Sequence, residues 1–138
     1  MVLIKDFYTR KVNKLIQKNI PMVDCKKCGV CCSYIMVDLK EPKNKEEYDF
    51  IRWYLLHKNV VVYISNEDEW SIEFITPCKW LGSENTCTNY DKRPEICRKY
   101  HPEQCDKHIG PDKEFKHIFR TPEEFMDFIK NKGINFGV

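Results

Sequence analysis

Eight cysteines dominate the chemistry available to this chain of 138 residues, and they fall into two groups. The first group lies in the stretch CKKCGVCC and consists of Cys25, Cys28, Cys31 and Cys32. The second group follows further along the chain and consists of Cys78, Cys87, Cys97 and Cys105. Thiolates bind zinc, iron and iron–sulfur clusters. Because spacings of three residues let a loop wrap around one centre, the pattern predicts a metal site with all eight cysteines as candidate ligands.

The C-x₂-C-x₂-C run inside the first group bears on which metal is bound. Bacterial-type ferredoxins take three thiolates from such a run and the fourth from a remote segment. Zinc sites also use CxxC pairs, usually two pairs for each ion. The three-thiol run favours an iron–sulfur cluster of the 4Fe–4S type, and zinc remains the alternative cofactor.

The number of centres stays open, because Cys31 and Cys32 are neighbours in the sequence. Adjacent side chains of an extended chain point to opposite faces, so two neighbouring thiolates do not easily bind the same ion. Eight thiols could fill two four-ligand sites. They could equally supply one cluster and leave several cysteines as structural residues.

Cys97 is the first candidate for a fourth ligand to the centre of the first group. Pro94 would begin a turn that fixes its position, and Arg93 and Arg98 flank it with positive charge. Histidines are weaker candidates, since a lone histidine is more often an exposed or core residue. The other potential ligands considered, in falling order, are Cys78 and Cys87, then Cys105, and the histidines His108, His57, His101 and His117.

Disulfide bonds are the competing use for eight cysteines. The first nineteen residues, MVLIKDFYTRKVNKLIQKN, are broken by charges and lack the apolar centre of a secretory signal. The chain is also larger than the usual disulfide-stapled scaffold. We therefore expect reduced thiols, metal binding and a cytoplasmic location.

Several segments carry signals for the elements that must position these cysteines. Residues 5–19 have the pattern of an amphipathic helix, with Phe7, Val12, Leu15 and Ile16 close to one face. Residues 33–39 have the alternating pattern of side chains that is typical of a β-strand. Asn44 is a candidate cap for a helix that runs to about residue 57, and whose buried side chains would come from Tyr48, Phe50, Ile51, Tyr54 and Leu55.

The sequence of the second half of the chain predicts a hairpin and two further helices. The β-branched and aromatic runs 60–65 and 70–76 flank a polar turn at 66–69. A short helix is expected at 94–100. The sequence Thr-Pro-Glu-Glu at 121–124 is a capping box, and the helix it begins would end at Gly133, with its buried face made of Phe125, Phe128 and Ile129.

Together these signals predict an α+β fold. We expect one small domain over residues 1–138, with a short β-hairpin, a few helices and a loop-rich, cysteine-rich metal-binding core at about 25–105. The formal net charge of +2 gives no reason to expect nucleic acid as a partner. Apolar stretches such as Val60–Val62 are too short to cross a bilayer, so no membrane association is expected.

The sequence resembles the YkgJ-like CxxCxxCC family of zinc- or iron-chelating domains. The residues that carry the resemblance are CKKCGVCC at 25–32, PCKWL at 77–81, CTNY at 87–90 and RPEICR at 93–98. The family places a Phe-Pro shortly after the last Cys-Arg, whereas here the stretch KYHP at 99–102 is one residue longer. The resemblance implies a metal or iron–sulfur site and no particular reaction.

Three functions follow as hypotheses. The first is an iron–sulfur protein that acts in electron transfer, or as a redox-dependent accessory protein, with a redox or other protein partner. The second is a structural zinc module that binds a protein partner. The third is a metal-dependent modifying enzyme. No nucleotide-binding glycine loop or catalytic triad is apparent in the sequence, so the third rests on analogy with flagellin lysine methylases, which carry a similar cysteine-rich element.

Overall fold

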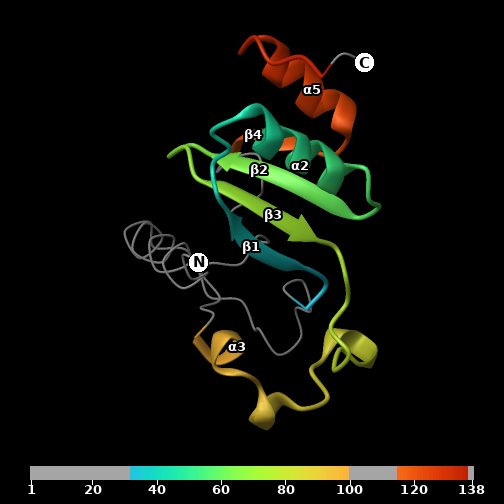
Figure 1. Cartoon of the computed structure of the whole chain (residues 1–138). Coiled ribbons are helices and arrows are strands. Elements are labelled where there is room, and N and C mark those ends of the chain that lie inside the picture. Colours follow the sequence, from blue (N-terminus) through green and yellow to red (C-terminus); the bar gives the residue numbers. More distant parts are fainter. Residues whose placement is uncertain (1–31, 100–114, 137–138) are drawn as a thin grey trace.

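The computed structural model describes residues 32–99 and 115–136 (Figure 1). Within them, four strands form one antiparallel sheet in the order β1-β3-β2-β4. The strands are β1 (Ile35–Leu39), β2 (Val60–Ser65), β3 (Trp70–Phe74) and β4 (Phe115–Phe119). The helices are α2 (Lys45–Leu55), α3 (Glu95–Lys99) and α5 (Pro122–Lys130), with short 3₁₀ turns η2 (Ser83–Asn85) and η3 (Tyr90–Lys92). The predicted α+β class is confirmed. The helix predicted at 5–19 lies outside the described residues.

Helix α2 begins where the sequence predicts. The Asn44 side chain accepts a hydrogen bond from the Glu47 amide at 2.9 Å, and the Glu47 carboxylate accepts one from the Lys43 amide at 2.6 Å. These bonds satisfy backbone groups that a helix start leaves without partners. Tyr48, Ile51 and Leu55 are buried, as expected. Phe50 is 50 % exposed, and the helix ends two residues before the predicted position.

Helix α5 repeats the same capping arrangement. Thr121 accepts a hydrogen bond from the Glu124 amide at 3.2 Å, and the Glu124 carboxylate accepts one from the Arg120 amide at 2.7 Å. Gly133 follows the helix with a φ of +74°, a conformation that glycine adopts without strain. Phe125 and Ile129 are fully buried and Phe128 is partly buried against the same core, so the predicted cap and stop are confirmed, and the predicted face is buried at two of its three residues.

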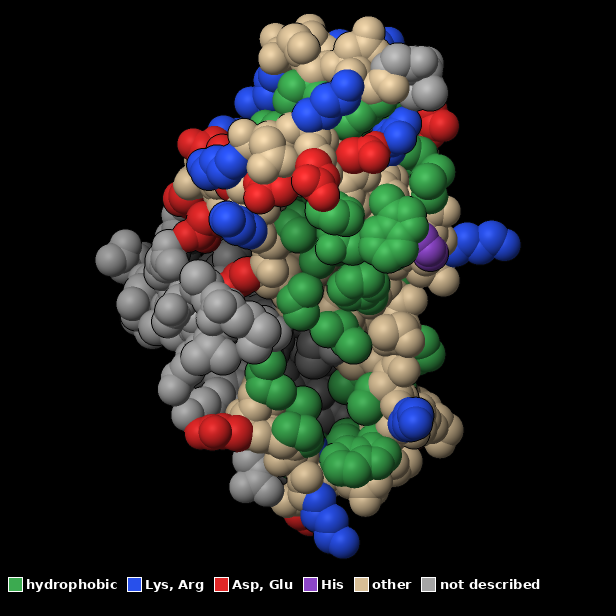
Figure 2. Space-filling view, viewed as in Figure 1, with side chains coloured by type: hydrophobic (Ala, Val, Ile, Leu, Met, Phe, Trp, Pro, Cys, Tyr) green, Lys and Arg blue, Asp and Glu red, His purple; other side chains and the backbone are tan. Residues whose placement is uncertain are grey.

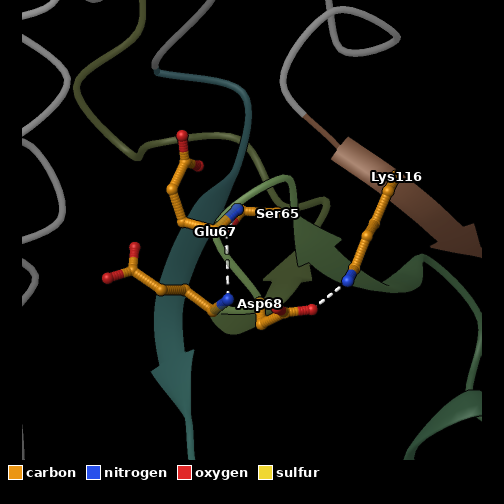
Figure 3. Close-up of polar contacts among 5 residues, drawn as sticks. Ser65, Glu67, Asp68 and Lys116 are labelled. Carbon is orange, nitrogen blue, oxygen red and sulfur yellow. Dashed lines mark hydrogen bonds and ion pairs between the residues drawn. The ribbon is translucent and has the colours of Figure 1, made fainter.

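The hairpin of β2 and β3 forms as predicted, and its turn is tied to the last strand. Figure 3 shows that the Asp68 amide donates to the Ser65 carbonyl oxygen, at 3.0 Å, while the Asp68 carboxylate pairs with Lys116. The Ser65 hydroxyl also accepts hydrogen bonds from the amides of Glu67 and Glu69. Since Lys116 belongs to β4, this ion pair links the hairpin turn to the edge of the sheet.

Strand β4 was not predicted from the sequence. It pairs with β2, but the register shifts between Ile64 and Ser65. This irregularity separates the two buried residues of β4, Phe115 and Phe119, into different hydrophobic clusters. A bulge of this kind breaks the alternation by which a strand is recognised in a sequence.

The main hydrophobic core lies between one face of the sheet and two helices. It combines Tyr48, Ile51 and Leu55 of α2 and Phe125 and Ile129 of α5 with inward-facing residues of β2, β3 and β4. Aromatic rings fill much of it; Phe125 contacts Tyr48, Trp70 and Phe119 at centroid distances of 6.1, 6.4 and 5.3 Å. No helix in the described part of the chain is long and apolar enough to cross a membrane.

Candidate metal centre

Sheet pairing brings one cysteine of each group together, Cys32 of the first and Cys78 of the second. In the antiparallel pair of β1 and β3, Ile35 lies opposite Phe74. The chain before β1 and the chain after β3 therefore leave the same end of the sheet. There the amide of Cys78 donates a hydrogen bond to the carbonyl oxygen of Cys32, with an N···O distance of 2.6 Å. A cysteine of the first group thus touches one of the second across 46 residues of sequence.

The chain turns tightly at Cys78. The Leu81 amide donates to the Cys78 carbonyl oxygen at 3.1 Å, and the Trp80 amide lies 3.4 Å from the Cys78 sulfur as a donor. Amide hydrogen bonds to sulfur stabilise a thiolate and tune the potential of a cluster that it binds. The turn therefore suits Cys78 to metal ligation.

A small hairpin then returns the chain to the neighbourhood of Cys78. Leu81 pairs with Cys87 in an antiparallel bridge, and both the amide and the hydroxyl of Thr88 donate to the Trp80 carbonyl oxygen, at 2.8 and 2.9 Å. Gly82 permits the close approach, because a Cβ atom there would lie 2.8 Å from the Thr88 methyl group. The hairpin holds Cys87 at a fixed register from Cys78.

Arg93 organises the segment that carries Cys97. Its guanidinium lies 3.6 Å from the centroid of the Tyr90 ring, and its Nε donates to the Tyr90 carbonyl oxygen at 2.9 Å. Its Nη1 donates to the Cys97 carbonyl oxygen at 3.4 Å, and the Cys97 amide donates to the Pro94 carbonyl oxygen at 3.0 Å. The predicted helix over 94–100 is observed as α3, one turn that begins after Pro94.

The thiols of Cys78 and Cys87 act electrostatically on the thiol of Cys97. Burial raises the pKa of the Cys97 thiol, and the Arg93 guanidinium opposes that shift. Cys78 and Cys87 raise the pKa of Cys97 further. A bound cation would relieve such repulsion between thiolates.

The cysteine segment has almost no hydrophobic core of its own. From Phe74 to Cys97 no side chain is buried; Trp80 is 37 % exposed and Ile96 is 50 % exposed. Trp80 is therefore not a core aromatic residue. Figure 2 shows hydrophobic side chains at the surface in the lower part of the view, where Figure 1 places this segment. An interaction other than hydrophobic packing must therefore stabilise this segment.

Four of the eight predicted ligands are described, and four are not. The structure describes Cys32, Cys78, Cys87 and Cys97, and the last three are free thiols. Within 32–99 and 115–136, no three histidine, cysteine, aspartate or glutamate side chains lie close enough together to hold a metal ion. The eight-ligand assignment therefore stays a prediction. The remaining candidates lie outside the described residues: Cys25, Cys28, Cys31, Cys105, His101 and His108.

The two described histidines have other contacts. The His57 ring is hydrogen-bonded to the Trp53 carbonyl oxygen at 2.9 Å. His117 stacks on Phe119 and lies against Phe128, at centroid distances of 5.9 and 4.8 Å. His117 pairs with Ile64, which lies opposite Trp70 at the far end of β3 from the cysteines. His117 therefore lies against the main hydrophobic core and away from the cysteines.

The comparison with known families agrees with this arrangement. The family model of CxxCxxCC, with the description "Putative zinc- or iron-chelating domain", matches residues 24–122. The chain belongs to the CxxCxxCC family. The matched range contains all eight cysteines and every strand and 3₁₀ turn of the structure, and the membership supports binding of zinc or iron. Searches of curated proteins and of solved structures give no match.

Proposed function

We propose that this CxxCxxCC protein holds a cysteine-ligated iron–sulfur cluster of the 4Fe–4S type and acts in electron transfer or as a redox-dependent accessory protein. The observation that carries the proposal is the hydrogen bond between Cys78 and Cys32. It joins the last cysteine of the C-x₂-C-x₂-C-C stretch to the first downstream cysteine. A ferredoxin-like cluster needs a three-thiol loop and a remote fourth thiol in the same place.

The surroundings of the thiols suit such a cluster. The Trp80 amide supports the Cys78 sulfur, and Arg93 places positive charge next to the Cys97 main chain. Four thiolates carry excess negative charge, which nearby donors and guanidinium groups offset. When bound, the cluster would supply one-electron redox chemistry, while these residues orient the ligands and set the potential.

A structural zinc site is the second candidate function. The observation that favours it is the lack of buried side chains between Phe74 and Cys97, because structural zinc replaces a hydrophobic core in small domains. In that case the protein would bind a protein partner without redox chemistry. A metal-dependent modifying enzyme is a third candidate and rests only on the analogy with other proteins of similar cysteine pattern.

The cysteine thiols also bear on the cellular location of the protein. We place the protein in the cytoplasm, because free cysteines persist under reducing conditions. The proposed partner is a redox protein or another protein, not nucleic acid or a membrane. The whole chain, 1–138, is proposed to be one domain with the metal-binding core at 25–105.

Metal analysis of protein purified without oxygen tests the proposal. We expect brown protein that contains iron and acid-labile sulfide in about equal amounts, as a 4Fe–4S cluster requires. Colourless protein with stoichiometric zinc and no sulfide would transfer the assignment to the zinc module. Protein that binds neither metal and contains disulfides would exclude both.

A further inference from the structure

The second face of the sheet is buried although none of the described helices covers it. Met36, Val61, Tyr63 and Phe115 form a hydrophobic cluster on this face, each with 9 % or less of its surface exposed. No residue of α2, α3 or α5 belongs to the cluster, and α2 and α5 contribute to the core on the opposite face. Side chains on an uncovered sheet face stay accessible to water, so another part of the chain must lie over them.

The sequence outside the described residues offers two substantial segments. Residues 100–114, YHPEQCDKHIGPDKE, contain two prolines and only scattered apolar side chains, so they cannot supply a continuous apolar surface. Residues 5–19 have apolar side chains at helical spacing, namely Phe7, Val12, Leu15 and Ile16. Such a stripe is the usual partner of an open sheet face.

Charge also favours residues 5–19. The second face carries a buried glutamate: Glu73 is 8 % exposed, and its carboxylate accepts a 2.6 Å hydrogen bond from the Tyr63 hydroxyl. Asp38, paired with Ser71 on β3, adds a second carboxylate to the same face. Buried carboxylates need positive charge nearby. Residues 5–19 contain five basic residues and a single acid: Lys5, Arg10, Lys11, Lys14 and Lys18 against Asp6.

The path of the chain permits the contact. Residues 20–31 connect this segment to Cys32, just before the edge strand β1. Twelve residues span up to about 40 Å when extended, whereas a four-stranded sheet is only about 15 Å wide. The connection is long enough to lead back over the second face.

We propose that residues 5–19 form an amphipathic helix that packs on the second face of the sheet, over Met36, Val61, Tyr63 and Phe115. This docking has a consequence for the cysteines. The loop CKKCGVCC is then fixed from both ends, by the docked helix before it and by the hydrogen bond of Cys32 to Cys78 after it. The helix acts as a positioning element for the loop and does not depend on which metal the loop binds.

Photo-cross-linking in the intact chain tests the contact directly. Leu15 is replaced by p-benzoylphenylalanine, and Asn13, on the opposite side of the predicted helix, is replaced in a matched control. The expected result is an intramolecular cross-link from position 15 to peptides that contain Met36 or Val61–Tyr63, with a yield several times that from position 13. Cross-links from position 15 to α2 or α5, equal yields from both positions, or cross-links mainly between two copies would overturn the proposal.

A stability measurement supplies an independent check. Leu15→Asp should lower the melting temperature by on the order of 10 °C, because it places a charge against a buried apolar face. Asn13→Asp changes the same segment to the same residue on the other side of the helix and should leave the melting temperature within about 2 °C. If both variants melt like the unmodified protein, residues 5–19 do not cover the second face. If Leu15→Asp does not fold, the cross-linking result decides.

Discussion

The amide of Cys78 lies 2.6 Å from the carbonyl oxygen of Cys32, at the end of the sheet where β1 begins and β3 ends. This hydrogen bond is short for an N–H···O contact, and it joins two segments that both carry cysteines predicted to be metal ligands. The pairing of β1 with β3 therefore does more than complete a sheet. It places Cys32, the last cysteine of the first group, beside Cys78, the first of the second.

Metal removal should loosen the cysteine segment and leave α5 intact. Residues 77–97 contain no buried side chain, so we expect their order to depend on a bound metal. Structural metal sites contribute on the order of 10 kcal/mol in small domains. After chelation under reducing conditions, amide hydrogen exchange within 77–97 should become at least about tenfold faster. Exchange in α5, whose Phe125 and Ile129 are fully buried, should change little. Unchanged exchange within 77–97 would contradict a structural role for the metal.

Arg93→Lys should weaken metal retention although it keeps the positive charge. Lysine lacks the planar group that stacks on the Tyr90 ring and donates to two carbonyl oxygens. We expect metal transfer to a chelator to become roughly five- to tenfold faster, as loss of a stacked cation contact suggests. Lys92→Ala is the matched control, since Lys92 is exposed and precedes Arg93 directly. Equal transfer rates in the two variants would refute the role given to the guanidinium.

Two hydroxyls on the second sheet face should differ in their contribution to stability. Tyr63→Phe removes the donor to the buried Glu73 carboxylate and should lower the free energy of unfolding by about 1–3 kcal/mol. The Ser71 hydroxyl is fully buried with no hydrogen-bond partner within the described part of the chain. Ser71→Ala should therefore change the free energy of unfolding by less than about 0.5 kcal/mol. Urea denaturation of both variants gives the comparison, and a larger loss in Ser71→Ala would reverse it.

His117 should make the protein less stable in mild acid. Burial lowers the pKa of His117, and Lys116 and Lys132 lower it further. The unfolded chain then binds a proton at this residue more readily than the folded chain, so stability falls as the pH drops below about 6.5. The loss levels off below the folded-state pKa. His117→Gln removes this titration. Its melting temperature should decline less between pH 7 and pH 5.5 than that of the unmodified protein, and parallel declines would contradict the assignment.

Local signals account for the elements that the sequence predicted correctly. Asn44 and Thr121 cap their helices through the amides of Glu47 and Glu124, contacts that span three residues. The hairpin of β2 and β3 likewise depends on a short polar turn between two β-branched runs. Caps and turns are encoded within a few residues, so they can be recognised without knowledge of the rest of the fold.

Long-range relationships account for what the sequence did not predict. Strand β4 is defined by its pairing with β2 and is interrupted by a register shift, so its own residues carry little alternation. The contact of Cys78 with Cys32 depends on the register of β1 against β3, which pairs Ile35 with Phe74. The types and spacing of the cysteines indicated a metal site, but only the sheet explains why Cys32 and Cys78 meet.

Metal and sulfide content of single cysteine variants, measured without oxygen, tests the central claim most directly. The claim is that the first loop and a downstream cysteine hold one centre. Cys28→Ala should abolish the centre, and iron and sulfide per chain should fall to background. Cys105→Ala, the matched control from the end of the cysteine segment, should keep most of both. If Cys28→Ala retains its full metal content, the loop CKKCGVCC is not the site. If Cys105→Ala loses as much as Cys28→Ala, an arrangement that uses all eight cysteines replaces the single centre.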